Sequence, residues 1–145
     1  MKIFHDALVQ PYVFFEGRCE EAIEFYKKAL GAEQQFLMRF KDCSVPPPGL
    51  SAGSENKIMH AHLRIGRNIV LVSDGRCSGK SGFQGFFLSL LLSNEAEVDQ
   101  AFGALAEGGQ IQMPLDQTFF SPRFGMLIDR FVVGWMVLVQ QQPTK

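Results

Sequence analysis

The order strand, helix, strand, strand, strand occurs twice along this chain, and this repeat constrains the fold more than any other feature of the sequence. A shift of 76 residues lays the apolar helix positions Ala22 and Tyr26 onto Val98 and Phe102. Few residues are identical between the halves, so the repeat is one of element order and pattern. Each copy leaves its sheet with one uncovered face. We therefore expect an α+β fold in which two curved mixed sheets pair and enclose a cavity.

The first copy of the repeat covers about residues 10–74. An apolar run over residues 12–15 is typical of a strand, and residues 19–30 change to the spacing of an amphipathic helix that ends at Gly31. The strands that follow are expected over residues 34–40, 58–65 and 68–73.

A glycine-rich linker, residues 75–85, leads to the second copy, about residues 86–140. Residues 86–92 are an apolar run typical of a strand, and Asn94 is suited to cap a helix that begins at Glu95. The apolar face of this helix is expected to consist of Val98, Ala101, Phe102 and Leu105. Three further strands are expected over residues 110–113, 125–129 and 135–140.

The composition fits one globular domain made of these two modules. The chain has 145 residues, of which 46% are hydrophobic, and its 14 basic and 15 acidic residues give a net charge of −1. This balance favours neither nucleic acid nor an acidic membrane surface as a partner. The most apolar stretch, residues 86–92, is also far shorter than the roughly 20 residues that a membrane-spanning helix needs.

The three cysteines, Cys19, Cys43 and Cys77, show no C-x-x-C spacing of a zinc or redox site. Their odd number argues against a disulfide framework and favours free thiols in a reducing compartment. We therefore expect the protein to be cytoplasmic.

Two histidines stand two residues apart in the strand expected over residues 58–65. Alternation places Ile58, His60, His62 and Arg64 on one face and Met59, Ala61, Leu63 and Ile65 on the other. His60 and His62 would supply half of a metal site, and Asp74 at the end of the next strand would add a carboxylate. The alternative is a polar ladder between neighbouring strands.

A second cluster joins aromatic and polar residues in loops and at strand ends of the second copy. Its members are Thr118, Phe119, Phe120, Phe124, Gly125, Asp129 and Trp135. Aromatic residues placed in this way suit the wall of a ligand pocket, whereas core packing is the alternative for each of them.

Several of these segments resemble the PhnB-like proteins of the vicinal oxygen chelate superfamily, which includes glyoxalase I, bleomycin-resistance proteins and extradiol dioxygenases. The resemblance lies in Pro11-Tyr12, the helix segment Glu21–Tyr26, His60-Ala61, Ser73-Asp74, Thr118–Phe120, Phe124-Gly125, Asp129 and Trp135-Met136. It covers residues 11–140 and implies paired βαβββ modules that assemble as a homodimer. The His and Asp typical of PhnB-like proteins correspond to His60 and Asp74.

The resemblance also implies where a metal would bind. Enzymes of the superfamily place His, Glu or Gln on the first and last strands of both modules. The corresponding positions here are Pro11 or Tyr12, Leu71, Phe86 or Phe87, and Val137 or Leu138. None of these is a usual metal ligand, so no cofactor is expected at the glyoxalase-type site.

Two hypotheses for function follow, and they differ in whether the protein is an enzyme. In the first, a dimeric cavity binds a small metabolite without metal, through His60, His62, Asp74, Phe119, Phe120 and Trp135. In the second, the protein is a metal-dependent lyase or dioxygenase-type enzyme in which His60, His62 and Asp74 hold a divalent metal. Without metal, His60 would be a general base and Asp74 would orient its ring.

Overall fold

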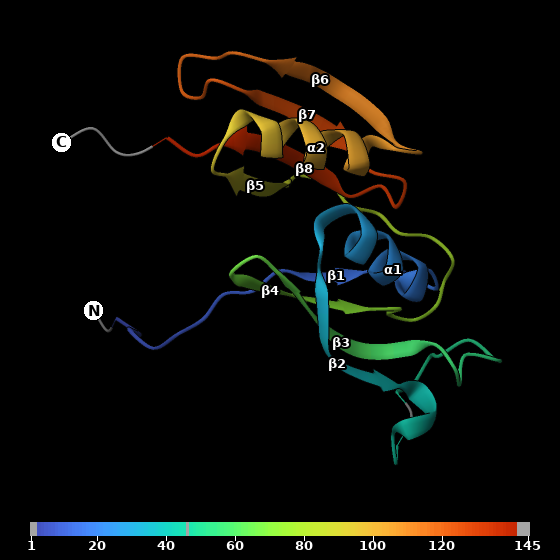
Figure 1. Cartoon of the computed structure of the whole chain (residues 1–145). Coiled ribbons are helices and arrows are strands. Elements are labelled where there is room, and N and C mark those ends of the chain that lie inside the picture. Colours follow the sequence, from blue (N-terminus) through green and yellow to red (C-terminus); the bar gives the residue numbers. More distant parts are fainter. Residues whose placement is uncertain (1–2, 46, 142–145) are drawn as a thin grey trace. The chain divides into compact units, whose positions relative to one another are not determined.

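The computed structural model describes residues 3–45 and 47–141, and within them the chain forms two four-stranded mixed sheets and two α-helices. Two compact units contain these elements (Figure 1). The first unit holds the chain up to Ile23 together with Ala32–Lys80, and the second holds Glu24–Gly31 together with the chain from Ser81 onward. The fold is α+β, as the repeat predicts.

The first sheet has the strand order β1-β4-β3-β2. Its strands are β1 (Tyr12–Phe14), β2 (Glu33–Arg39), β3 (Ile58–Ile65) and β4 (Asn68–Ser73). β1 is parallel to β4, whereas the other pairs are antiparallel. The hairpin between β3 and β4 turns at Gly66, whose φ of 59° favours glycine. A short 3-10 helix, η1 (Phe40–Asp42), follows β2.

The second sheet repeats this topology with the order β5-β8-β7-β6. Its strands are β5 (Leu88–Leu92), β6 (Gln110–Asp116), β7 (Phe124–Ile128) and β8 (Gly134–Val139). β5 is parallel to β8, and β7 is antiparallel to both β6 and β8. The predicted repeat of element order is confirmed.

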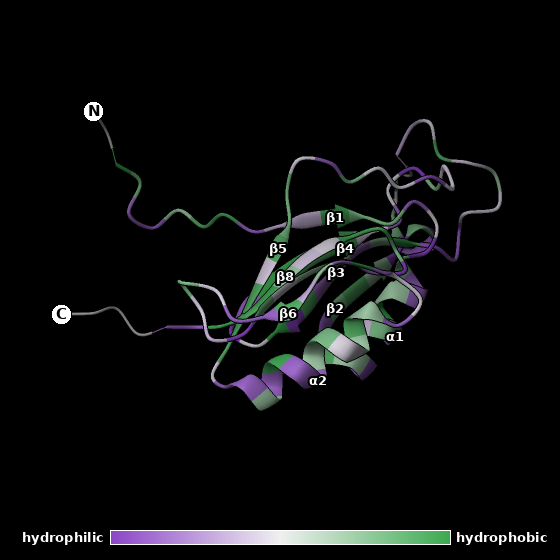
Figure 2. Cartoon of the chain, turned by 90° about the horizontal axis from the view of Figure 1, so that it is seen from above, coloured by the Kyte–Doolittle hydropathy of each residue, from purple (hydrophilic) through white to green (hydrophobic). Residues whose placement is uncertain are grey.

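Helix α2 (Glu95–Ala106) covers one face of the second sheet and contacts all four of its strands (Figure 1). The side chain of Asn94 accepts a 2.9 Å hydrogen bond from the Glu97 amide, which is the predicted N-cap. The predicted apolar face is buried and consists of Val98, Ala101, Phe102 and Leu105. Figure 2 shows hydrophilic residues beside hydrophobic ones along this helix.

Helix α1 (Cys19–Leu30) begins and ends at the predicted residues. Cys19, Ala22 and Ile23 are buried, and Gly31 follows with a φ of 67° that suits a helix C-terminus. The residues of α1 from Glu24 onward belong to the second unit. No helix among residues 3–45 and 47–141 is long and apolar enough to cross a membrane.

An irregularity in β3 changes which residues face the open side of the first sheet. The register shifts next to Met59, because its neighbours Ile58 and His60 pair with consecutive residues of β2. Met59 lines a pocket, whereas Ala61 and Leu63 are buried. The expectation that Met59 shares the face of Ala61 and Leu63 is therefore wrong, since the extra residue in the strand interrupts the alternation.

Candidate ligand-binding site

Two aromatic rings of β1 lie on the open face of the first sheet. Tyr12 and Phe14 alternate with the buried Val13, and their side chains remain 41% and 43% exposed. The two rings stack with their centroids 4.6 Å apart and their planes 10° from parallel. Stacked aromatic rings that remain exposed suit contact with a ligand.

A hydrogen-bonded chain of three side chains starts at Tyr12 and runs into β3. The Oη of Tyr12 lies 2.6 Å from Nδ1 of His60, and Nε2 of His60 lies 2.9 Å from Nε2 of His62. The ring of Phe36, which pairs with His62 in register, lies 5.3 Å from the His62 ring between centroids. The structure thus brings the two predicted histidines together and adds a phenol to them.

The surroundings of Tyr12 and His60 favour the uncharged form of each side chain. Burial, and to a lesser extent the neighbouring His62, lowers the pKa of His60 below its usual 6.5. Burial, and to a lesser extent Cys19, raises the pKa of Tyr12 above its usual 10.0. Because a phenol and a neutral imidazole each donate and accept, the chain can be hydrogen-bonded in either direction.

A pocket of about 550 Å³ opens beside this chain, within the first unit. Tyr12 belongs to both the pocket wall and the hydrogen-bonded chain. The apolar part of the wall consists of Tyr12, Phe14, Phe40, Pro47 and Met59. The polar part consists of Glu16, Ser73, Arg76 and Ser78, next to Gly75. An apolar wall with a few polar groups at fixed positions is typical of small-molecule sites.

Glu16 holds the loop that supplies the polar part of the wall. Its Oε1 accepts hydrogen bonds from the Ser78 hydroxyl at 2.8 Å, the Ser78 amide at 3.1 Å and the Arg76 amide at 3.3 Å. Gly75 has a φ of 60°, which favours glycine, and a Cβ there would lie 2.0 Å from Oε2 of Glu16 and displace this carboxylate. The Glu16 carboxylate therefore fixes residues 75–78 in place at the pocket.

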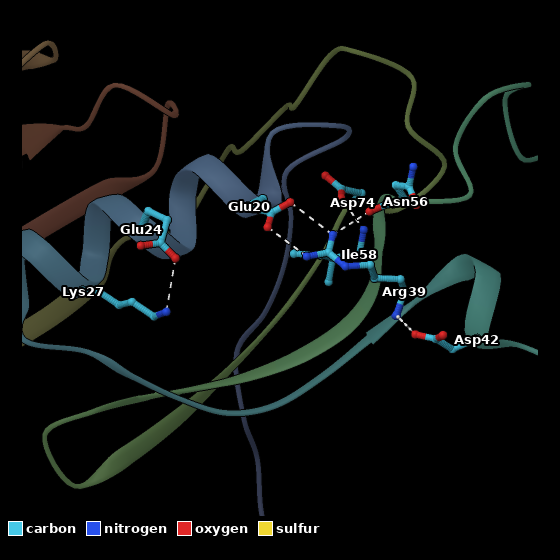
Figure 3. Close-up of polar contacts among 8 residues, drawn as sticks. All are labelled: Glu20, Glu24, Lys27, Arg39, Asp42, Asn56, Ile58 and Asp74. Atoms are coloured by element: carbon cyan, nitrogen blue, oxygen red, sulfur yellow. Dashed lines mark hydrogen bonds and ion pairs between the residues drawn. The ribbon is translucent and has the colours of Figure 1, made fainter.

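Asp74 is buried, and its carboxylate is bound by backbone amides. Oδ1 accepts from the Gly17 amide at 3.0 Å and the Cys19 amide at 2.8 Å. Oδ2 accepts from the Ile58 amide at 2.7 Å, as Figure 3 shows. This carboxylate joins the end of β4 to the start of β3 and to the N-terminus of α1, where a negative charge stabilises the helix.

Arg39 at the end of β2 makes a second polar connection in the same region (Figure 3). Its guanidinium group donates to both carboxylate oxygens of Glu20, at 3.1 and 2.8 Å, and to the Asn56 carbonyl at 2.6 Å. The hydrogen bond with Arg39 is the main reason why the pKa of Glu20 is lowered. This pair connects α1 to the sheet outside the pocket.

The structure divides the predicted aromatic cluster of the second copy into a buried part and an exposed part. Asp129 and Trp135 are buried, and Oδ2 of Asp129 accepts from the Trp135 indole at 2.9 Å and from the Tyr26 hydroxyl. Its Oδ1 accepts from the amides of Phe131 and Val133 at 2.8 and 3.0 Å. These bonds hold the turn between β7 and β8 in the core of the second unit.

The exposed part is the loop between β6 and β7. Phe119 is 97% exposed, and Phe120 packs edge-on against Phe124 with 5.0 Å between ring centroids. The Thr118 hydroxyl accepts from the Ser121 amide at 3.1 Å, which shapes the loop. The assignment of Phe119, Phe120 and Trp135 as ligand-binding residues stays a prediction.

Phe14, Glu16 and Arg76 line the pocket without having been predicted from the sequence. A signal for Phe14 was present, because Tyr12 and Phe14 alternate around one apolar residue in a short strand. The position of Arg76 depends on Glu16, which lies 60 residues earlier in the chain. No local pattern carries that information.

Comparison with known proteins identifies the family. The sequence profile described as the glyoxalase/bleomycin resistance protein/dioxygenase superfamily matches residues 8–137. The chain belongs to this superfamily. Its two mixed sheets, each with a parallel outer pair, agree with the fold that the resemblance implied.

Among individual relatives of this superfamily member, protein YjdN of Escherichia coli (strain K12) is 34% identical over 145 residues, which cover 94% of this chain and 99% of that protein. The crystal structure of PA1353 from Pseudomonas aeruginosa is 38% identical with a TM-score of 0.81, covering 94% and 100% of the two chains. A structure from Bacillus cereus, described as a putative 3-demethylubiquinone-9 3-methyltransferase, PhnB protein, is 26% identical with a TM-score of 0.75, covering 92% and 99%. The PhnB-like assignment is confirmed.

The superfamily implies a metal site, but the positions it would use do not fit a metal in this chain. Tyr12 and Leu71 are direct neighbours in the register between β1 and β4, Phe86 and Phe87 directly precede β5, and Val137 and Leu138 lie in β8. Apart from the Tyr12 hydroxyl, these side chains contain no donor atom for a metal. Within the described part of the chain, no three His, Cys, Asp or Glu side chains group as a metal site. A metal held by His60, His62 and Asp74 stays a prediction.

Proposed function

We propose that this superfamily member binds a small, partly apolar metabolite in the pocket of its first unit and that it does so as a cytoplasmic homodimer. The observation that carries the proposal is the pocket itself, whose volume of about 550 Å³ lies within the range of small-molecule sites. The stacked rings of Tyr12 and Phe14 offer a flat apolar surface at one side of it.

The polar groups of the pocket indicate what kind of molecule would bind. The Glu16 carboxylate is held by Ser78 and by backbone amides, so it keeps a fixed position in the wall. The Arg76 side chain is exposed beside it and has the flexibility to contact an acidic group of the ligand. We therefore favour a metabolite with an aromatic or aliphatic part and one acidic group.

The open face of the second sheet supports the homodimer. Gly125 faces α2, since a Cβ there would lie 2.7 Å from the Phe102 ring, and its neighbour Met126 therefore faces the other way. Met126 pairs in register with Met113 on one side and Met136 on the other. Met113 at 45% and Leu91 at 48% exposure show how much apolar surface remains uncovered. A second copy of the chain would remove this surface from water.

The metal-dependent enzyme of the second hypothesis receives less support from the structure. Each oxygen of Asp74 already accepts backbone hydrogen bonds, three in all. These bonds use both acceptor positions of Oδ1 and one of Oδ2, and Asp74 is only 1% exposed, so little of the carboxylate is accessible to a metal. Asp74 therefore supports the pocket as a structural residue.

We would test the proposal with a panel of small acidic metabolites, first by thermal shift and then by isothermal titration calorimetry. We expect at least one compound to stabilise the protein, and we expect Phe14→Ala and Arg76→Ala to weaken its binding by about tenfold or more. Arg67→Ala removes another exposed arginine, in the β3–β4 turn, and is the matched control. A ligand that binds all four proteins equally, or a panel without any binder, would contradict the proposed site.

A further inference from the structure

The side chains of His60 and His62 point their Nε2 atoms at one another on the open face of the first sheet. The two nitrogens are 2.9 Å apart, and the ring planes are 89° from parallel. Neither ring lines the pocket proposed to bind the metabolite. Their separation is that of a hydrogen bond, in which one Nε2 carries the proton and the other accepts it. A metal ion beside the line that joins the two nitrogens can bind both of them once that proton is displaced.

The separation of the two nitrogens agrees with a particular coordination geometry. With metal–nitrogen bonds of about 2.0–2.1 Å, nitrogens 2.9 Å apart subtend an angle of about 90° at the metal. Neighbouring ligands in square-planar and octahedral sites form this angle, whereas a tetrahedral site would need about 3.3 Å between the nitrogens. The geometry therefore fits Cu²⁺ or Ni²⁺ better than tetrahedral Zn²⁺.

Tyr12 supports the same interpretation from the other side of the His60 ring. Its Oη lies 2.6 Å from Nδ1 of His60. Histidines that bind a metal through one nitrogen usually donate the other N–H to an oxygen, which fixes both the ring and the position of its proton. When His60 donates from Nδ1 to Tyr12, its Nε2 lone pair points at His62 and is available to a metal.

We propose that His60 and His62 form a two-nitrogen chelate for a divalent transition-metal ion, with Tyr12 as its positioning residue. Cu²⁺ is expected to bind most tightly, because it combines the preferred geometry with the highest affinity of the first-row divalent ions. Each ring stays neutral, since the proton displaced from between the Nε2 atoms moves to Nδ1 of its own ring. Water or another small ligand fills the remaining coordination positions.

The test uses the full chain without an affinity tag, stripped of metal by a chelator and titrated with Cu²⁺ in competition with glycine. We expect one Cu²⁺ per chain and an electron paramagnetic resonance spectrum with coupling to two nitrogens. His60→Gln and His62→Gln should each lose the two-nitrogen signal. Tyr12→Phe should keep that signal but weaken binding by about 10- to 100-fold, because it removes only the positioning hydrogen bond.

His5→Gln is the matched control, since His5 is the third histidine of the chain and lies in the exposed N-terminal segment. It should leave both affinity and spectrum unchanged. A measurement on the wild type alone avoids any effect of the substitutions on folding: substoichiometric Cu²⁺ should broaden the imidazole NMR signals of His60 and His62 before that of His5. Equal broadening of all three, or wild-type binding no tighter than that of the His60→Gln/His62→Gln double variant, would overturn the proposal.

Discussion

The indole Nε1 of Trp135 donates a 2.9 Å hydrogen bond to Oδ2 of Asp129, and both side chains are buried in the second unit. The same oxygen accepts from the Tyr26 hydroxyl, and Oδ1 accepts two backbone amides. A buried carboxylate needs such donors, because an ionised group that is removed from water without partners is strongly destabilising. Trp135 thus has a defined structural role, whether or not it also contacts a ligand.

Trp135→Phe should destabilise the protein while leaving the pocket of the first unit intact. The variant loses a hydrogen bond to a charged group, which contributes about 1.5–3 kcal/mol. Urea unfolding followed by circular dichroism measures the difference in the free energy of unfolding. Phe119→Leu changes a ring that is 97% exposed and should alter that free energy by less than about 0.5 kcal/mol. Equal stability of Trp135→Phe and the wild type would show that the bond contributes nothing.

Asp74 and Asp129 each accept backbone hydrogen bonds and stabilise one of the two units. From the sequence, both are taken for site residues because of their positions. Each follows the end of a strand, which is a common place for a functional carboxylate. The amides that bind Asp74 belong to Gly17 and Ile58 among others, 57 and 16 residues away in the chain. Only the folded structure shows that these donors occupy the carboxylate.

We predict that Asp74→Ala destabilises the protein much more than Asp74→Asn. Alanine leaves three amides without a partner, at about 1–3 kcal/mol each, although relaxation reduces the sum. Asparagine keeps one acceptor oxygen, but its NH₂ group would face at least one of the three amides and leave it unpaired. The cost should therefore be about 1–3 kcal/mol. Urea unfolding measures both, and Asp116→Asn, at an exposed position, is the control. If Asp74→Ala is as stable as the control, the carboxylate does not stabilise the first unit.

The secondary structure was predictable where the signals are local. α1 begins at Cys19 and ends at Leu30 as predicted, because a helical apolar pattern and Gly31 mark it directly in the sequence. β6 shows the opposite case. It continues through Pro114 to Asp116, past the predicted end at Met113, because an outer strand of a sheet tolerates a proline. Whether a strand is outer or central depends on the whole sheet.

The candidate site was predictable only in part. His60 and His62 share a face because strand alternation is local, and the structure brings their rings together. The pocket depends instead on Met59, which the strand irregularity turns toward it, and on the loop held by Glu16. Both effects arise from contacts between distant segments.

The ion pair of Glu20 with Arg39 predicts a pH effect on stability. The hydrogen bond from Arg39 keeps the pKa of Glu20 below its usual 4.5, so the unfolded chain binds this proton more readily than the folded one. The stabilisation is therefore complete above about pH 4.5 and is lost as the pH falls through the lower pKa of the folded state. Carboxyl ¹³C NMR of Glu20 measures that pKa, and Arg39→Gln should raise it.

Arg64→Gln is the control for this measurement, because Arg64 pairs with Glu33 at 2.8 Å and not with Glu20. It should leave the Glu20 titration unchanged. Both side chains of the Glu20–Arg39 pair reach the surface, so the effect on overall stability should be small even though the shift of the titration is clear. A Glu20 pKa that does not respond to Arg39→Gln would contradict the assignment.

If two copies of the chain pair through the open face of the second sheet, a charge placed on that face should separate them. Met113→Glu places a carboxylate on this apolar surface, next to Met126 in the register. In a dimer interface it would lie without a partner and favour the monomer. Sedimentation velocity or light scattering should show a dimer for the wild type and a monomer for the variant. Val45→Glu adds the same charge at an exposed apolar residue of the first unit and should remain dimeric. A wild type that is monomeric at micromolar concentration would contradict the homodimer.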